Sequence, residues 1–241
     1  MKNLFCLIIV VFSTFLSSAQ APEYDDLKIL YADGKYEKLI ASAEKYTLKE
    51  SLKKDPYPFM WLSKGLYKMS ISGTSDEKYK ASYKESLGAL SKAMKLDKDS
   101  SCVNTHKEFV DELQMSLLNL TTDYITSDKF KDAGGSAAKY YKISYHFVGA
   151  KYIDAASKFK SGDKAAAEVI FKECDKILVA TTSIESWSDA DKAFFKAGIL
   201  FAADCYINAK QKEKAVALLN KVAHWFEEDE EFKTRYNEIV N

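Results

Sequence analysis

The chain has 241 residues, and its 35 Lys and Arg residues balance its 35 Asp and Glu residues. This balance argues against a nucleic-acid-binding protein, which usually carries a net positive charge or a basic block. Only one of the basic residues is Arg (Arg235), which argues against a site built on bidentate Arg–phosphate contacts. The composition, 47% hydrophobic and 29% charged, is that of a globular protein rather than a disordered one.

The first 19 residues are typical of a secretory signal peptide. A short basic start precedes the apolar run Leu4–Leu16, and Ser17-Ser18-Ala19 supplies the small residues that signal peptidase requires. The apolar run is too short for a lasting membrane anchor. We therefore expect cleavage after Ala19, an exported mature chain over residues 20–241, and no membrane span in that mature chain. An uncleaved anchor is the alternative.

Helical periodicity interrupted by short polar turns dominates the mature chain. Gly34 and Gly162 mark turns, and Pro56 suits the first turn of a helix. No segment shows the sustained alternation of a strand, so we expect an all-α fold. The stretch Asp132-Ala133-Gly134-Gly135-Ser136 is predicted to be the plainest break in the middle of the chain. In order, the predicted helices cover residues 24–33, 36–52, 59–69, 79–96, 102–126, 137–160, 165–180, 190–208, 213–226 and 232–240.

Several of these segments resemble tetratricopeptide repeats, in which small residues let two helices of a pair approach closely. The best-spaced segments are Ala202-Ala203-x2-Tyr206 with Ala215-x3-Leu219-x2-Val222, and Phe59-x2-Leu62-Ser63-x2-Leu66 with Ser86-x3-Leu90-x2-Ala93. The second segment carries extra residues between its helices, and the middle of the chain is out of register. The resemblance implies a single domain over residues 20–241, an α-α superhelix (solenoid) of about five helix-turn-helix pairs with a C-terminal capping helix. An irregular helical bundle is the alternative.

In that family the first helix of each pair lines an inner groove. The groove positions carry Tyr and Lys residues toward the N-terminal half, and Tyr provides rigid contact area while Lys adds a positive field. The family's pattern for binding a terminal carboxylate is not reproduced. The resemblance thus implies a candidate partner-binding groove formed by Tyr24, Lys28, Tyr31, Tyr57, Met60, Lys64, Tyr67 and Lys68.

We find no pattern in the sequence that predicts a catalytic residue, a metal site or a cofactor. His106, His146 and His224 are far apart and lack metal-ligand spacing. Ser136-x2-Lys139 resembles a motif of penicillin-binding enzymes, but this spacing is common on polar helix faces. The acidic run at residues 227–231 can attract a cation or a basic peptide, or it can be a solvated helix junction.

Three cysteines remain after export: Cys102, Cys174 and Cys205. Stacked helix pairs place Cys174 and Cys205 on adjacent helices, so the two either form a disulfide or are small buried thiols, and Cys102 is the odd thiol in both cases.

These observations predict a non-enzymatic protein-binding scaffold. The low Arg usage and the Ser-Ala-Gln signal end resemble exported proteins of Gram-negative bacteria, which indicates the periplasm or the outer cell envelope. The alternative, from another functional class, is a protein that binds an oligosaccharide or another small ligand through the same aromatic groove.

Overall fold

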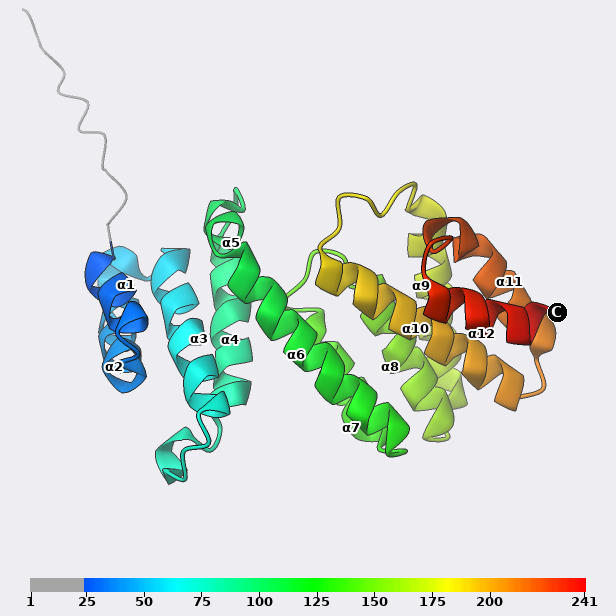
Figure 1. The fold of residues 1–241 in the computed structure, drawn as a ribbon, viewed down its shortest axis with the longest axis horizontal. Coiled ribbons are helices and arrows are strands. Elements are labelled where there is room, and N and C mark those ends of the chain that lie inside the picture. Colours follow the sequence, from blue (N-terminus) through cyan, green and yellow to red (C-terminus); the bar gives the residue numbers. More distant parts are fainter. Residues whose placement is uncertain (1–23) are drawn as a thin grey trace, which may run out of the picture.

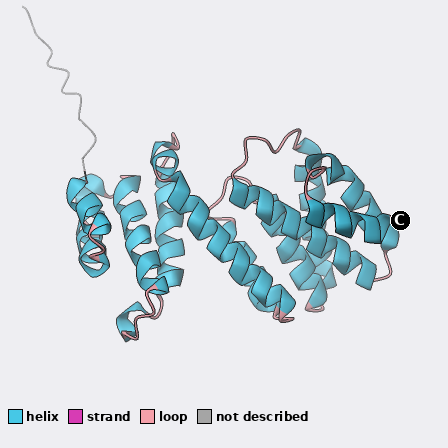
Figure 2. Cartoon of the chain, viewed as in Figure 1, coloured by secondary structure: helices cyan, strands magenta, loops and turns pink. Residues whose placement is uncertain are grey.

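The computed structural model describes residues 24–241, and these residues form an all-helical protein. Helices make up 77% of this part of the chain, and it contains no strand, which confirms the expected all-α fold (Figure 2). The predicted signal peptide and the predicted new N-terminus at Gln20 lie outside the described residues. Within the described residues, no helix has the length and apolarity needed to cross a bilayer.

The first helices follow one another along the long axis of the molecule from α1 at one end, and α11 and α12 lie at the other end (Figure 1). Among the later helices, α10 begins beside α6 and crosses α8. Most of them are long enough to bury one apolar face against a neighbour. The α-helices of residues 24–241 are α1 (Asp25–Ala32), α2 (Tyr36–Thr47), α3 (Pro56–Ile71), α4 (Ser82–Leu96), α5 (Ser101–Thr105), α6 (Lys107–Thr126), α7 (Phe130–Tyr140), α8 (Val148–Lys160), α9 (Lys164–Ala180), α10 (Asp189–Asn208), α11 (Lys212–Val222) and α12 (Glu230–Val240). Short 3₁₀ helices cover Glu50–Leu52, Glu77–Tyr79 and Ala223–Trp225.

Consecutive helices pack against each other as pairs. α1 contacts α2, α3 contacts α4, α6 contacts α7, α8 contacts α9, and α10 contacts α11. Three junctions between pairs are direct, since α2 packs on α3, α7 packs on α8, and α8 packs on α10. The α3–α4 pair is joined to α6 through the short helix α5, which contacts α3, α4 and α6. The last helix, α12, lies on α10 and α11. It is held there by the buried side chains of Phe232 and Ile239 and by Arg235, whose Nε donates a 2.9 Å hydrogen bond to Asp204 on α10.

Local sequence explains several helix boundaries. Gly34 and Gly162 adopt positive φ angles of 68° and 95°, which other residues rarely adopt, and the chain turns at both positions as predicted. At the start of α3, the Asp55 carboxylate accepts a 2.9 Å hydrogen bond from the backbone N–H of Tyr57, and Pro56 occupies the first turn. An acidic N-cap followed by Pro is a favourable helix start.

The predicted break at Asp132–Ser136 is wrong, because these residues lie inside α7. Small residues are needed there for packing: a Cβ atom on Gly134 would lie 3.2 Å from the Cβ of Ser157 on α8. The Ser136 hydroxyl lies 2.7 Å from the Thr121 hydroxyl on α6. Tertiary contacts thus outweigh the low helix propensity of glycine.

The predicted helix over residues 137–160 is interrupted instead at residues 141–147, between α7 and α8. In this link the Ser144 hydroxyl accepts a 2.9 Å hydrogen bond from the backbone N–H of His146, an interaction that competes with helix formation. Ser144 also donates to the buried carboxylate of Asp191 on α10 (2.5 Å), which accepts a second hydrogen bond from Tyr140 (2.6 Å). The link is therefore fixed by a buried polar network.

The hydrophobic core is divided unequally along the chain. One continuous cluster of buried side chains extends from α3 to α12. The first two helices are held to α3 by two small separate clusters, one around Trp61 and Leu39 and one around Ile40 and Leu66. The N-terminal pair consequently has less buried apolar contact than the rest of the molecule.

Glycine lets α8 and α10 cross with their backbones in contact. A Cβ atom on Gly198 of α10 would lie 2.1 Å from the carbonyl oxygen of Gly149 on α8, and a Cβ atom on Gly149 would lie 2.3 Å from the carbonyl oxygen of Phe194. Backbone atoms cannot yield as a flexible side chain can, so any larger residue must push the two helices apart.

We predict that Gly198→Ala destabilises the protein by about 1–3 kcal/mol, because overpacking against a rigid backbone shifts α10 as a whole. The matched control is Gly135→Ala, since Gly135 is helical and nothing lies within 4 Å of its added Cβ. This control should stabilise the protein by about 0.5–1 kcal/mol through the lower entropy of its unfolded chain. Urea denaturation measures both values. A neutral Gly198→Ala variant would contradict the close crossing, and a destabilising Gly135→Ala would contradict the helical assignment of α7.

Candidate partner-binding face

The eight predicted groove residues lie on α1, on α3 or directly before α1, and they separate into two groups. Tyr24, Met60 and Tyr67 are buried, with 3%, 0% and 6% of their surface exposed. Tyr24 donates a 2.6 Å hydrogen bond to Asp55, and its ring meets the ring of Tyr46 edge-on at 5.2 Å. Their assignment to an accessible groove is therefore corrected: a helical pattern does not distinguish a residue that faces the groove from one that faces the next helix, and these three are packing residues.

The other five residues, Lys28, Tyr31, Tyr57, Lys64 and Lys68, are at least partly exposed. The structure brings Tyr31 of α1 and Lys64 of α3 together, with the Lys64 ammonium 4.5 Å from the centre of the Tyr31 ring. Lys28 pairs with Asp25 on its own helix at 2.8 Å. Lys68 pairs with Glu112 of α6 at 2.9 Å. These five side chains are thus accessible, and two of the three lysines, Lys28 and Lys68, are already paired with carboxylates.

Two buried rings that the sequence analysis did not single out, Trp61 (5% exposed) and Phe109 (4% exposed), lie beneath the partly exposed side chains of Tyr31 and Lys64. The Lys64 ammonium also lies 4.5 Å from the Trp61 ring and 5.7 Å from the Phe109 ring of α6. Three rings from three helices therefore surround one ammonium group, an arrangement in which each ring attracts the cation. Trp61 could have been identified from the sequence, because it adjoins the predicted groove residue Met60 on the same predicted helix. Nothing local indicated Phe109, because its contact depends on how α6 crosses α3. We call Tyr31, Trp61, Lys64 and Phe109 the aromatic–lysine cluster.

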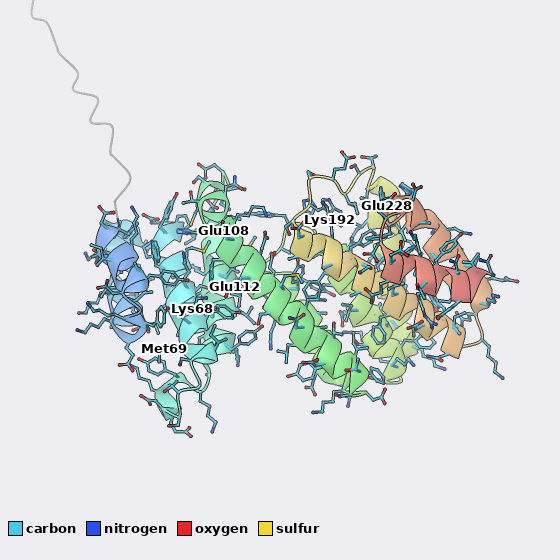
Figure 3. The ribbon with its side chains drawn as sticks, viewed as in Figure 1. Lys68, Met69, Glu108, Glu112, Lys192 and Glu228 are labelled. Atoms are coloured by element: carbon cyan, nitrogen blue, oxygen red, sulfur yellow. The ribbon has the colours of Figure 1, made fainter. Side chains whose placement is uncertain are left out.

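On this face α3 carries the basic residues Lys64 and Lys68, and α6 carries acidic residues. Figure 3 shows Glu108 and Glu112 on α6, on the side that faces Lys68 of α3. Burial lowers the pKa of Lys64, and the nearby Lys68 lowers it further, whereas Glu112 and Glu108 act in the opposite direction. Within the described residues Lys64 forms no ion pair. Lys64 is consequently the cation of this face that is held by aromatic rings rather than by a carboxylate.

His106 lies behind the cluster, between α5 and α6. Its ring meets Trp61 edge-on at 5.1 Å and Tyr57 at 6.0 Å. Its Nε2 atom is buried and has no hydrogen-bond partner in the described part of the chain. Burial, followed by the charge of Lys64, lowers the pKa of His106 to about 4. The imidazole is therefore neutral at pH 7 and acts as a packing group.

The thiols and the Ser136 hydroxyl, which the sequence analysis considered for chemistry, are buried inside the fold. The three thiols of residues 24–241 are buried and free, so Cys174 and Cys205 form no disulfide. Burial raises the pKa of Cys174 to about 12 and that of Cys205 to about 11, which leaves their thiolates scarce at neutral pH. Ser136 is buried against Thr121. Among the described residues, no group of three or more His, Cys, Asp or Glu side chains is placed to hold a metal ion.

We predict that His106 lowers the free energy of unfolding as the pH falls from 7 to 5. Its folded pKa of about 4 lies below the ordinary value of 6.5, so between these pH values the unfolded chain binds a proton that the folded chain does not. The resulting loss should reach about 1 kcal/mol at pH 5 after allowance for partial exposure. In urea denaturation at pH 7 and pH 5, His106→Phe should reduce the difference between the two values by that amount. An unchanged difference would show that His106 does not carry the effect.

The chain matches no protein-family model, no curated protein and no solved structure. The resemblance to tetratricopeptide repeats accordingly rests on the spacing of residues in the sequence. Function has to be argued from the surfaces of this molecule.

Proposed function

We propose that this chain is an exported, non-enzymatic scaffold that binds a protein segment in the bacterial periplasm or outer cell envelope. We further propose that its five helix pairs form a tetratricopeptide-like superhelix closed by α12. The packing of consecutive helices as pairs supports this arrangement, as do the short connections 33–35, 127–129, 161–163 and 209–211 within four of the five pairs. In such a superhelix, α1, α3 and α6 would be the first helices of three consecutive pairs and would share one face.

The observation that carries the proposal is the aromatic–lysine cluster. Its residues come from α1, α3 and α6, the same three helices that the proposed superhelix would place on one face. A partly exposed Tyr beside a Trp and a cation is the type of group that dominates binding energy at protein interfaces. Lys64 has no carboxylate partner among the described residues, so its charge is available to an acidic or amphipathic segment.

The experiment is photo-crosslinking in cells of the source organism. A photoreactive phenylalanine analogue replaces Tyr31, and a matched control replaces Lys84, which is exposed on α4. The proposal expects a specific protein adduct from position 31 that is absent from position 84 and disappears when Lys64→Met is added. An oligosaccharide that raises the melting temperature, with no protein adduct at either position, would favour the alternative ligand class and overturn the protein-binding assignment.

Two substitutions should separate binding from folding. We predict that Tyr31→Ala weakens partner capture by about 1–3 kcal/mol and changes stability by no more than about 1 kcal/mol, because the ring is only partly buried. Tyr67→Ala should instead lower stability by about 3 kcal/mol, because its buried ring packs on Tyr83 and Phe109. Binding of the crosslinked partner and thermal melting are measured on the same samples. Equal loss of stability in both variants would place Tyr31 in the core as well.

A further inference from the structure

A second surface lies in the C-terminal half of the molecule (Figure 3). An open cavity of about 640 Å³ is bordered by the loop after α9, the first half of α10 and the segment between α11 and α12. Lys192 of α10 and Glu228 of the segment before α12 both line it, and Figure 3 labels them. The cavity is large enough for a long side chain together with part of the backbone that carries it.

The floor of the cavity is apolar and fixed. Ile184 and Phe226 are nearly fully buried beneath it, and Trp225 lines it with a partly exposed ring. Trp225 packs at 5.8 Å against Phe195 of α10, which holds the indole in place. No hydrogen bond joins the indole N–H to any group in the described part of the chain. The floor therefore offers one aromatic face and one donor that the fold itself does not use.

The charges around the cavity are unequally paired. Lys192 donates a 3.2 Å hydrogen bond to the backbone carbonyl of Glu185, and Lys196 forms ion pairs of 2.9 and 2.6 Å with Asp229 and Glu231. Both lysines are therefore occupied by the protein. Four carboxylates around the same cavity form no ion pair and no side-chain hydrogen bond within the described residues: Glu185, Asp189, Glu227 and Glu228.

Helix chemistry accounts for only part of this negative charge. Asp189 is the first residue of α10, where an acidic side chain stabilises the positive end of the helix dipole. Glu185 lies in the loop after α9, and Glu227 and Glu228 lie before the N-cap residue of α12, so the cap does not need them. The excess is local, because the whole chain has equal numbers of acidic and basic residues.

We propose that this cavity binds a basic side chain, Arg or Lys, of a basic peptide segment in a partner protein. The cation would lie over the Trp225 ring between Glu185 and Glu228, which come from segments on different sides of the cavity. The indole N–H would donate to a carbonyl of the bound backbone. A metal ion is a poorer fit, since no group of three ligands converges in the described chain.

The test is calorimetric titration of the full mature chain with the blocked peptide Ala-Arg-Lys-Arg-Ala, with Ala-Glu-Glu-Glu-Ala as the charge-reversed probe. The basic peptide should bind, and raising NaCl from about 50 to about 300 mM should weaken it at least fivefold. The double variant Glu185→Gln/Glu228→Gln should weaken it at least tenfold. Trp225→Leu should weaken it about fivefold.

The matched control is Glu85→Gln/Glu213→Gln, which makes the same change in net charge at exposed positions away from the cavity. It should change the affinity by less than twofold. Absence of binding, equal affinity for the acidic peptide, or an equal loss in the control would each overturn the proposal. Displacement of the peptide by about 1 mM Ca²⁺ at constant ionic strength would also overturn it, by assigning the carboxylates to a metal. Lys64→Met should leave this titration unchanged, so the result is independent of the N-terminal face.

Discussion

The backbone contact between Gly149 and Gly198 is the constraint on which the C-terminal half depends. It lets α8 and α10 cross so closely that no side chain separates them. Because α7 and α9 also pack on α8, the position of four helices is set by this crossing. The buried Asp191 carboxylate then joins the start of α10 to the end of α7 through Tyr140. The first half of α10 is thereby fixed, and it forms one wall of the C-terminal cavity.

The two surfaces described above differ in how they balance charge. On the N-terminal face one cation, Lys64, is held among aromatic rings rather than by a carboxylate. In the C-terminal cavity four carboxylates form no ion pair within the described residues, whereas both lysines are engaged. The two surfaces therefore offer local charge of opposite sign, which suits them to different partners or to oppositely charged segments of one partner.

Much of the fold was predictable because helical periodicity, Gly34, Gly162 and Pro56 are local signals. The error at Gly134 has a physical cause: glycine lowers helix propensity, but here it serves a close contact with Ser157 that is visible only once α8 is in place. The sequence placed candidate residues on α1 and α3, but it did not indicate the contribution of Phe109 from α6. Periodicity placed Tyr67 and Lys64 on the same helix, yet only the crossing of α6 decides that Tyr67 is covered and that Lys64 gains Phe109. The spacing of residues along one helix does not predict contacts with a helix that is distant in the sequence.

The unequal division of the core has a consequence for local opening. The α1–α2 pair contacts the remainder mainly through α3 and two small clusters, so it should open at a lower free energy than the helices joined by the continuous core. Amide hydrogens of α2 would then exchange long before those of α8. A ligand that contacts α1 and α3 together would bind only the state in which the α1–α2 pair is packed on α3. Its binding would therefore stabilise that state and suppress local opening. If the N-terminal face binds a partner as proposed, binding would also make this end of the molecule more rigid.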